Sequence, residues 1–140
     1  MNELGRGRFI AYSAGSHPNG VANPFAIEYL AGIGLPVDGL RSKSWNEFAV
    51  HGAPKMDFIF TVCDQAAGEA CPFWPGRPMT AHWGVPDPAG VIGTDEEKRR
   101  AFKDTASAMR RRIELFINLP VETLDKFTLQ QELKAIEDTP

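Results

Sequence analysis

Apolar residues gather in a few dense runs along the chain, and their spacing predicts strands alternating with helices. Residues 8–15 carry apolar side chains at both odd and even positions, which is typical of a strand covered on both faces. Residues 56–63 are rich in aromatic and β-branched side chains, and residues 79–83 form a shorter run of the same kind. We therefore expect strands at 8–15, 56–63 and 79–83.

Helical signals occur between and after these runs. Asn23 followed by Pro24 is a typical helix start, and the glycines at 32 and 34 end that helix. A capping box at 94–97 begins a long helix with apolar positions recurring to about residue 119. Short helices are expected at 44–48 and between 124 and 136. This order predicts an α/β fold, a three-layer open parallel sheet with helices on both faces.

The first residues do not match this scheme. Residues 3–5 resemble the end of a helix whose body is absent, and a parallel sheet with two strong strands is thin. A strand and a helix before Met1 would complete the sheet, so we expect an N-terminally truncated form of the fold. A missing first strand would expose an apolar edge, through which the chain would form homo-oligomers.

Length and composition narrow the class of protein. The 140 residues predict one domain over 1–140, and 43% apolar residues with 24% charged residues exclude a disordered chain. No apolar run reaches the ~20 residues that span a bilayer, and residues 1–20 lack a signal-peptide pattern. The 2 cysteines are too few for a secreted disulfide framework. We expect a cytoplasmic protein.

Charge argues against a nucleic-acid partner. The net charge is −3, and the basic residues of the long helix alternate with acidic ones. Ion pairs four residues apart and a solvated face explain this basic run. Its members are Lys98, Arg99, Arg100, Lys103, Arg110, Arg111 and Arg112.

Cys63 and Cys71 are the first candidates for chemistry. Cys63 ends the strongest strand, and Cys71 begins a loop rich in proline and glycine. One interpretation is a redox pair in which one thiolate attacks and the other resolves. The other is two small apolar core residues, because no CxxC motif is present. Neither cysteine has metal-ligand spacing, so no metal is expected.

Asp87 stands between two prolines after a strand, where ligand sites of open parallel sheets lie. A carboxyl group held there could donate a proton to a leaving oxygen. The alternative is an aspartate that forms a turn. Ser13, at the end of the first run, could be a nucleophile, but no Gly-x-Ser-x-Gly elbow surrounds it. His82 precedes the Asp87 loop and could orient it.

Five short segments, taken together and in their order along the chain, resemble the arsenate reductases built on the low-molecular-weight protein tyrosine phosphatase fold. They are residues 12–16 (YSAGS), 40–45 (LRSKSW), 60–64 (FTVCD), 71–72 (CP) and 82–90 (HWGVPDPAG). The resemblance extends over nearly the whole chain. The cysteine blocks together with HWG and DPA are typical of the reductase branch rather than of the plain phosphatases.

The resemblance implies a function and a set of roles. Arsenate would be reduced to arsenite through a cascade of thiols, with Asp87 as the general acid. Cys63 would resolve an arseno-cysteine, and Cys71 would receive the resulting disulfide. Ser13 matches a position that supports the oxyanion loop. No metal or organic cofactor is implied. The partners are arsenate or phosphate and an external reductant such as thioredoxin, glutaredoxin or a small thiol.

One family feature is missing from the sequence. The family's nucleophile lies in a Cys-x5-Arg loop after the first strand, and here only Cys71 and Arg77 have this spacing. Pro72 and Pro75 remove amide donors that would cradle an anion, so this segment is not that loop. The first strand, the oxyanion loop and most of the first helix would lie before Met1.

Three explanations remain for this departure: a start assigned too late, a true truncation without catalysis, or a partner that completes the sheet. We favour the first, and expect the chain as it stands to be inactive without the nucleophile loop. The alternative functions are a low-molecular-weight protein tyrosine phosphatase and a non-catalytic binding remnant of this fold.

Overall fold

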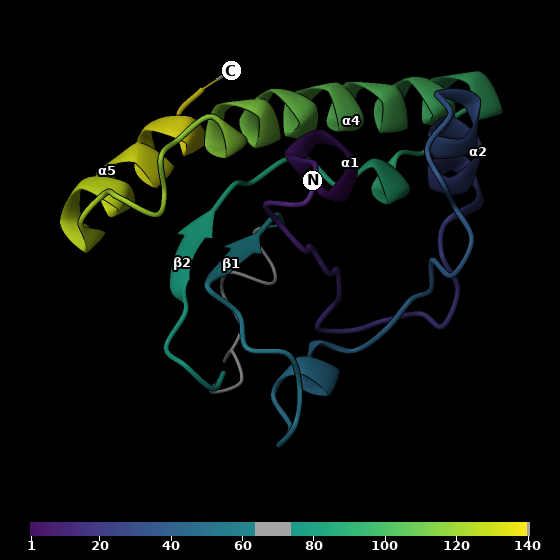
Figure 1. Cartoon of the computed structure of the whole chain (residues 1–140). Coiled ribbons are helices and arrows are strands. Elements are labelled where there is room, and N and C mark those ends of the chain that lie inside the picture. Colours follow the sequence, from purple (N-terminus) through teal and green to yellow (C-terminus); the bar gives the residue numbers. More distant parts are fainter. Residues whose placement is uncertain (64–73, 140) are drawn as a thin grey trace.

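A pair of parallel strands stands at the centre of the computed structural model, which describes residues 1–63 and 74–139. Strand β1 (Phe58–Thr61) pairs with β2 (Met79–His82), from Phe58 beside Met79 to Thr61 beside His82 (Figure 1). Both strands lie within the runs that the sequence singled out. The predicted α/β class with a parallel sheet is confirmed.

The helices begin where the sequence places their caps. Thr94 Oγ1 accepts a hydrogen bond from the amide of Glu97, and Asn23 Oδ1 accepts one from the amide of Phe25. The helices are α1 (Asn2–Gly5), α2 (Pro24–Gly32), α4 (Asp95–Ile117) and α5 (Lys126–Glu137), with 3-10 helices η1 (Trp45–Phe48) and η2 (Pro88–Gly90). None of the helices in the described ranges combines the length and apolar character required to cross a bilayer.

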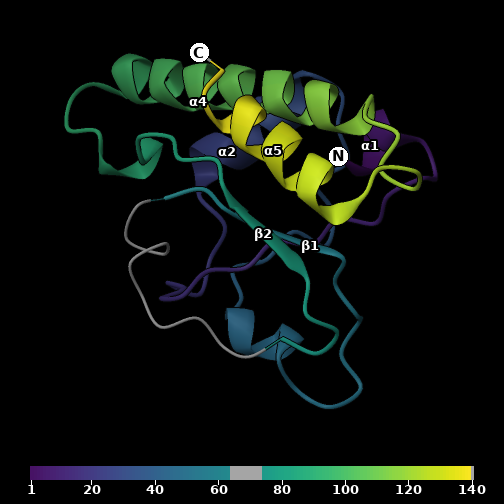
Figure 2. The ribbon, with the colours of Figure 1, turned by 90° about the vertical axis from the view of Figure 1, so that its left-hand side faces the viewer.

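Helix α4 organises the packing. Helices α1, α2 and α5 and the short η2 all contact it, and α5 also packs against β2 (Figures 1 and 2). The core lies between these two helices and the strands. Its buried members are Trp83, Phe116, Leu133 and Ile136. Phe58 and Phe60 point into this core from β1, because they lie on the same face of the strand.

The predicted strand at residues 8–15 is wrong. Within the described residues this segment makes only one bridge, in which Gly15 pairs with Ser44. Instead of a neighbouring strand, the Asn2 side chain bonds the amide and carbonyl of Ala11, at 2.8 and 3.1 Å. Ile10 is 79% exposed, so the segment is not covered on both faces.

The apolar residues of this segment serve two separate contacts instead. The ring of Phe9 lies 5.3 Å from that of Phe116 in the core, and the ring of Tyr12 lies 5.3 Å from that of Phe48 on η1. A run with apolar side chains at odd and even positions therefore arises here without sheet burial. Periodicity alone does not separate these two cases.

Phe116 is the residue of α4 with the most ring contacts, so its removal gives the largest stability effect we expect in the core. It is fully buried, and its ring contacts those of Phe9, Phe58, Phe60 and Trp83. Phe116→Ala should lower the free energy of unfolding by about 3–5 kcal/mol. Urea denaturation measures this loss. The matched control is Leu115→Ala on the same helix, which is 44% exposed and should change stability by less than about 1 kcal/mol.

Candidate active site

The carboxyl ends of the two strands lie side by side, because β1 and β2 are parallel and end in register at Thr61 and His82. The two side chains are in hydrogen-bond contact there, with Thr61 Oγ1 2.7 Å from His82 Nδ1. This edge of an open parallel sheet is where ligands bind. The histidine of the HWG block is thus bound to the neighbouring strand, which holds the start of the following loop.

Backbone pairing continues beyond the strands. The Trp83 amide donates to the Thr61 carbonyl at 2.8 Å, and the Val85 amide donates to the Val62 carbonyl at 2.9 Å. Cys63 follows Val62 directly. The segment that carries this cysteine and the segment that enters the Pro-Asp-Pro loop therefore leave the sheet at the same edge.

Asp87 begins the short helix η2. Its Oδ1 accepts a hydrogen bond from the Ala89 amide at 2.9 Å, and Pro88 occupies the first helical position. Pro86 and Pro88 restrict the backbone on both sides of the carboxylate. Asp87 is exposed, and no hydrogen bond to its Oδ2 comes from the described residues. The predicted turn-forming role of Asp87 is therefore present.

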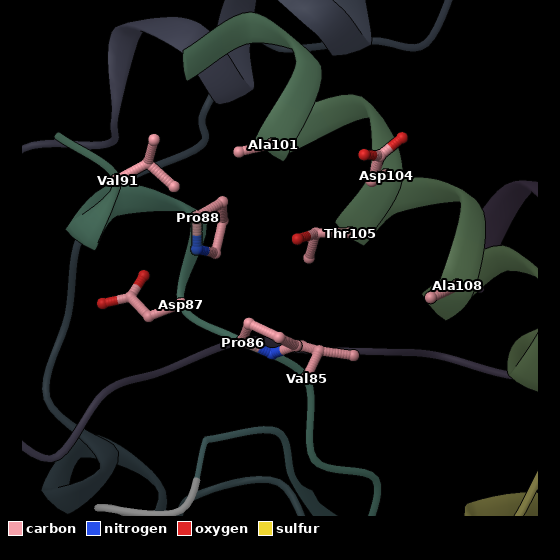
Figure 3. A pocket seen from close by; sticks show the side chains of 9 residues that line it. All are labelled: Val85, Pro86, Asp87, Pro88, Val91, Ala101, Asp104, Thr105 and Ala108. Atoms are coloured by element: carbon pink, nitrogen blue, oxygen red, sulfur yellow. The ribbon is translucent and has the colours of Figure 1, made fainter. Parts of the chain in front are cut away.

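A shallow hollow of about 260 Å³ lies between the Asp87 loop and α4. Its lining is Val85, Pro86, Asp87, Pro88, Val91, Ala101, Asp104, Thr105 and Ala108. Figure 3 shows that Pro88 and Thr105 face each other across it, whereas the Asp87 carboxylate points away from α4. The hollow therefore lies behind the carboxylate.

Of the two cysteines predicted to form a redox pair, the structure describes one. Cys63 is half-buried just beyond β1. Cys71 lies outside the described residues. The expected redox pair therefore stays a prediction, and the structure places only its first member at the strand edge.

Ser13 contacts a different part of the chain from Asp87 and Cys63. It is exposed, and its carbonyl accepts a hydrogen bond from Lys43 Nζ at 2.8 Å, next to the bridge made by Gly15. Arg41 and Glu47 pair at 2.6 Å nearby in the chain, and the Arg41 hydrogen bond lowers the pKa of Glu47. No described contact joins Ser13 to the strand edge, so its supporting role also stays a prediction.

The basic run on α4 is mostly solvated, as expected, with one exception. Arg110 pairs with Glu114 at 2.9 Å, and Arg99 pairs with Glu28 at 3.0 Å. Arg112, in contrast, is buried with 9% exposure. The expectation of a solvated side chain is wrong here, because Arg112 lies on the core face four residues before Phe116. That spacing was the signal in the sequence.

Metal-ligating side chains form no cluster in the part of the chain that the structure describes. No three side chains of His, Cys, Asp or Glu approach closely enough there to hold a metal ion. The chemistry available at the strand edge is that of a thiol, a carboxyl group and an imidazole.

Comparison with known proteins identifies the family. Residues 1–131 match the family described as low molecular weight phosphotyrosine protein phosphatase. The arsenate reductase of Halalkalibacterium halodurans is 35% identical over 105 residues, which cover 75% of this chain and 72% of that protein. The arsenate reductase of Bacillus subtilis is 31% identical with the same coverage. Arsenate reductase 2 of Staphylococcus epidermidis is 34% identical over 68% of this chain and 69% of its own length. The chain belongs to the low molecular weight phosphotyrosine protein phosphatase family.

Proposed function

We propose that this protein reduces arsenate to arsenite with electrons from cysteine thiols. In this scheme Asp87 is the general acid, Cys63 resolves the arsenic adduct, Cys71 completes a disulfide, and Ser13 supports the oxyanion site. The names of the relatives favour this reaction, as does the pair of cysteines, which a plain phosphatase does not need.

One structural observation carries the proposal. The hydrogen bond from the Val85 amide to the Val62 carbonyl joins the segment that leads to Cys63 with the segment that leads to Asp87. A resolving thiol and a proton donor must both reach the same arsenic centre. Their common edge of the sheet supports that requirement.

The reaction begins with a third thiolate, because the sequence holds 2 cysteines and both have later roles. By family resemblance this thiol belongs to a Cys-x5-Arg loop. Its sulfur forms a bond to arsenic(V), and one arsenate oxygen leaves. Asp87 donates the proton with which that oxygen departs as water.

The electrons move in the next step. The Cys63 thiolate attacks the sulfur of the adduct, so that a disulfide bond forms and the sulfur–arsenic bond breaks. The electron pair of the broken bond stays on arsenic, which becomes arsenic(III) and leaves as arsenite. The Cys71 thiolate then attacks Cys63 and releases the third thiolate. Overall two thiols become one disulfide, and one arsenate becomes arsenite and water.

An external dithiol restores the starting state. A protein of the thioredoxin or glutaredoxin class, or a small thiol, would reduce the disulfide between Cys63 and Cys71 by thiol exchange. Each turnover consumes one equivalent of a dithiol or two equivalents of a monothiol.

A single-turnover experiment tests the scheme. A reduced form of the protein that carries a Cys-x5-Arg loop is mixed with arsenate in the absence of reductant. Released arsenite is quantified in solution, and the disulfide is identified by peptide mass mapping. We expect equal amounts of arsenite and of a Cys63–Cys71 disulfide, with neither when phosphate replaces arsenate. Arsenite that forms without that disulfide, and only after a small thiol is added, would instead mean that a low-molecular-weight thiol resolves the adduct. Absence of arsenite, together with hydrolysis of aryl phosphates, would favour the phosphatase function after which the family is named.

A further inference from the structure

Arg112 is a buried cation on the core face of α4. Its side chain is 9% exposed, whereas the preceding Arg110 and Arg111 are exposed. Burial of a guanidinium group is costly unless hydrogen bonds replace the water that it loses. The position of Arg112 between Met109 and Ile113 would suit an apolar residue, so its charge calls for an explanation.

The partners of Arg112 are backbone carbonyls of the segment that follows β2. Its Nη1 donates to the carbonyl oxygens of Trp83, at 2.8 Å, and Gly84, at 3.0 Å. Hydrogen bonds from a charged donor to buried acceptors are among the stronger ones in proteins. Arg112 therefore holds two successive peptide groups from a helix that is far away in sequence.

These two residues are the place where the strand pairing changes register. The Trp83 amide bonds the Thr61 carbonyl, and the next pairing is from Val85 to Val62. The chain thus advances two residues on one side for one residue on the other, which is the pattern of a β-bulge at Gly84. A bulge turns backbone groups away from the ladder, and Arg112 binds the carbonyls at this point.

The bulge at Gly84 also fixes where the loop that carries Asp87 begins. Asp87 follows Gly84 by three residues, and the prolines on both sides of Asp87 leave the backbone little freedom. The far end of the loop is η2, in which Asp87 caps the Ala89 amide, and η2 packs against the same helix α4. The carboxylate is therefore carried on a short, stiff segment held to α4 at both ends.

We propose that Arg112 is a positioning residue for Asp87. It fixes the peptide groups of Trp83 and Gly84, and through them the place from which the carboxylate donates its proton. The catalytic part of this inference rests on the proposed role of Asp87 as general acid. The structural part, that Arg112 holds the loop, stands on the two hydrogen bonds alone.

Two variants and one control test the inference, in a form of the protein that carries a Cys-x5-Arg loop. Arg112→Met removes the charge and keeps the bulk, whereas Arg112→Lys keeps the charge and a donor. Arg110→Met is the matched control, because Arg110 has the same charge on the same helix and pairs only with exposed Glu114 among the described residues.

The first readout is hydrogen exchange of the Ala89 amide, which the Asp87 carboxylate caps. Arg112→Met should speed its exchange roughly tenfold or more, and Arg112→Lys should restore part of the protection. Arg110→Met should leave it unchanged. This measurement needs no enzymatic activity, so it decides the structural part even if the proposed function fails. Unchanged exchange in a folded Arg112→Met protein would overturn the inference.

The second readout is kcat/KM for two aryl phosphates, phenyl phosphate with a poor leaving group and p-nitrophenyl phosphate with a good one. Misplacement of a general acid slows the poor leaving group more. Arg112→Met should lower kcat/KM for phenyl phosphate by roughly 10- to 100-fold, with a smaller loss for the nitrophenyl ester. Equal losses for both esters would show a general structural effect and would contradict a role through Asp87. If Arg112→Met does not fold, Arg112→Lys carries both readouts.

Discussion

Replacement of Cys63 by serine should abolish arsenate turnover in a form of the protein that carries a Cys-x5-Arg loop. The hydroxyl of serine cannot attack the sulfur of an arsenic adduct and form a disulfide, so arsenic(V) keeps its oxidation state. Cys63 is half-buried just past β1, and serine is close to cysteine in size, so the fold should persist. Arsenite release at saturating arsenate measures the loss.

Hydrolysis of an aryl phosphate is the internal control for Cys63→Ser. That reaction requires no disulfide, so its rate should stay close to that of the unmodified protein. Cys71→Ser should release arsenite once and then stop, with Cys63 trapped in a mixed disulfide that mass spectrometry detects. Sustained arsenate turnover in both variants would exclude the cascade through these residues.

The second large effect is expected for Asp87→Asn. Asparagine is also a good helix cap, so its side-chain oxygen should still accept the Ala89 amide and hold η2 in place. What disappears is the acidic proton. We expect kcat for arsenate to fall by about 10²- to 10⁴-fold, the usual contribution of a general acid.

Asp104→Asn is the matched control for this prediction. Asp104 lies on α4 at the other side of the hollow, and the Asp87 carboxylate points away from that helix (Figure 3). The same loss of charge there should leave kcat unchanged. An unchanged kcat in Asp87→Asn would remove Asp87 from the proton-transfer step, and equal losses in both variants would indicate a nonspecific effect of charge.

Local signals in the sequence predicted the helices well. Thr94 and Asn23 cap α4 and α2 as their types suggest, because a cap depends on a few neighbouring residues. The aromatic run at 56–63 gave β1, and its neighbour at 79–83 gave β2. A turn formed by Asp87 is one of the two interpretations of that residue from the sequence, and the structure has a 3-10 helix there with Asp87 as its cap.

Other features depend on contacts that no local pattern contains. The segment 8–15 has the composition of a buried strand, yet its Phe9 and Tyr12 pack in two different places. Arg112 was grouped with its basic neighbours, although its spacing from Phe116 places it on the core face of the helix. The glycine at 84 is compatible with a bulge, but the change of register becomes visible only through pairing with a distant strand.

The hydrogen bond from Arg112 to the Trp83 carbonyl joins positions 29 residues apart. This separation in sequence affects the order in which the protein folds. Closing such a chain segment costs entropy before any contact repays it, so contacts of this kind form late. The capping turn at Asp87 is local and can form early, but its place relative to the strand edge is set only when α4 docks. We expect the region to gain helical signal during refolding before it gains catalytic competence. A newly synthesised chain would thus pass through a helical intermediate in which the Asp87 carboxyl group is not yet in its final position.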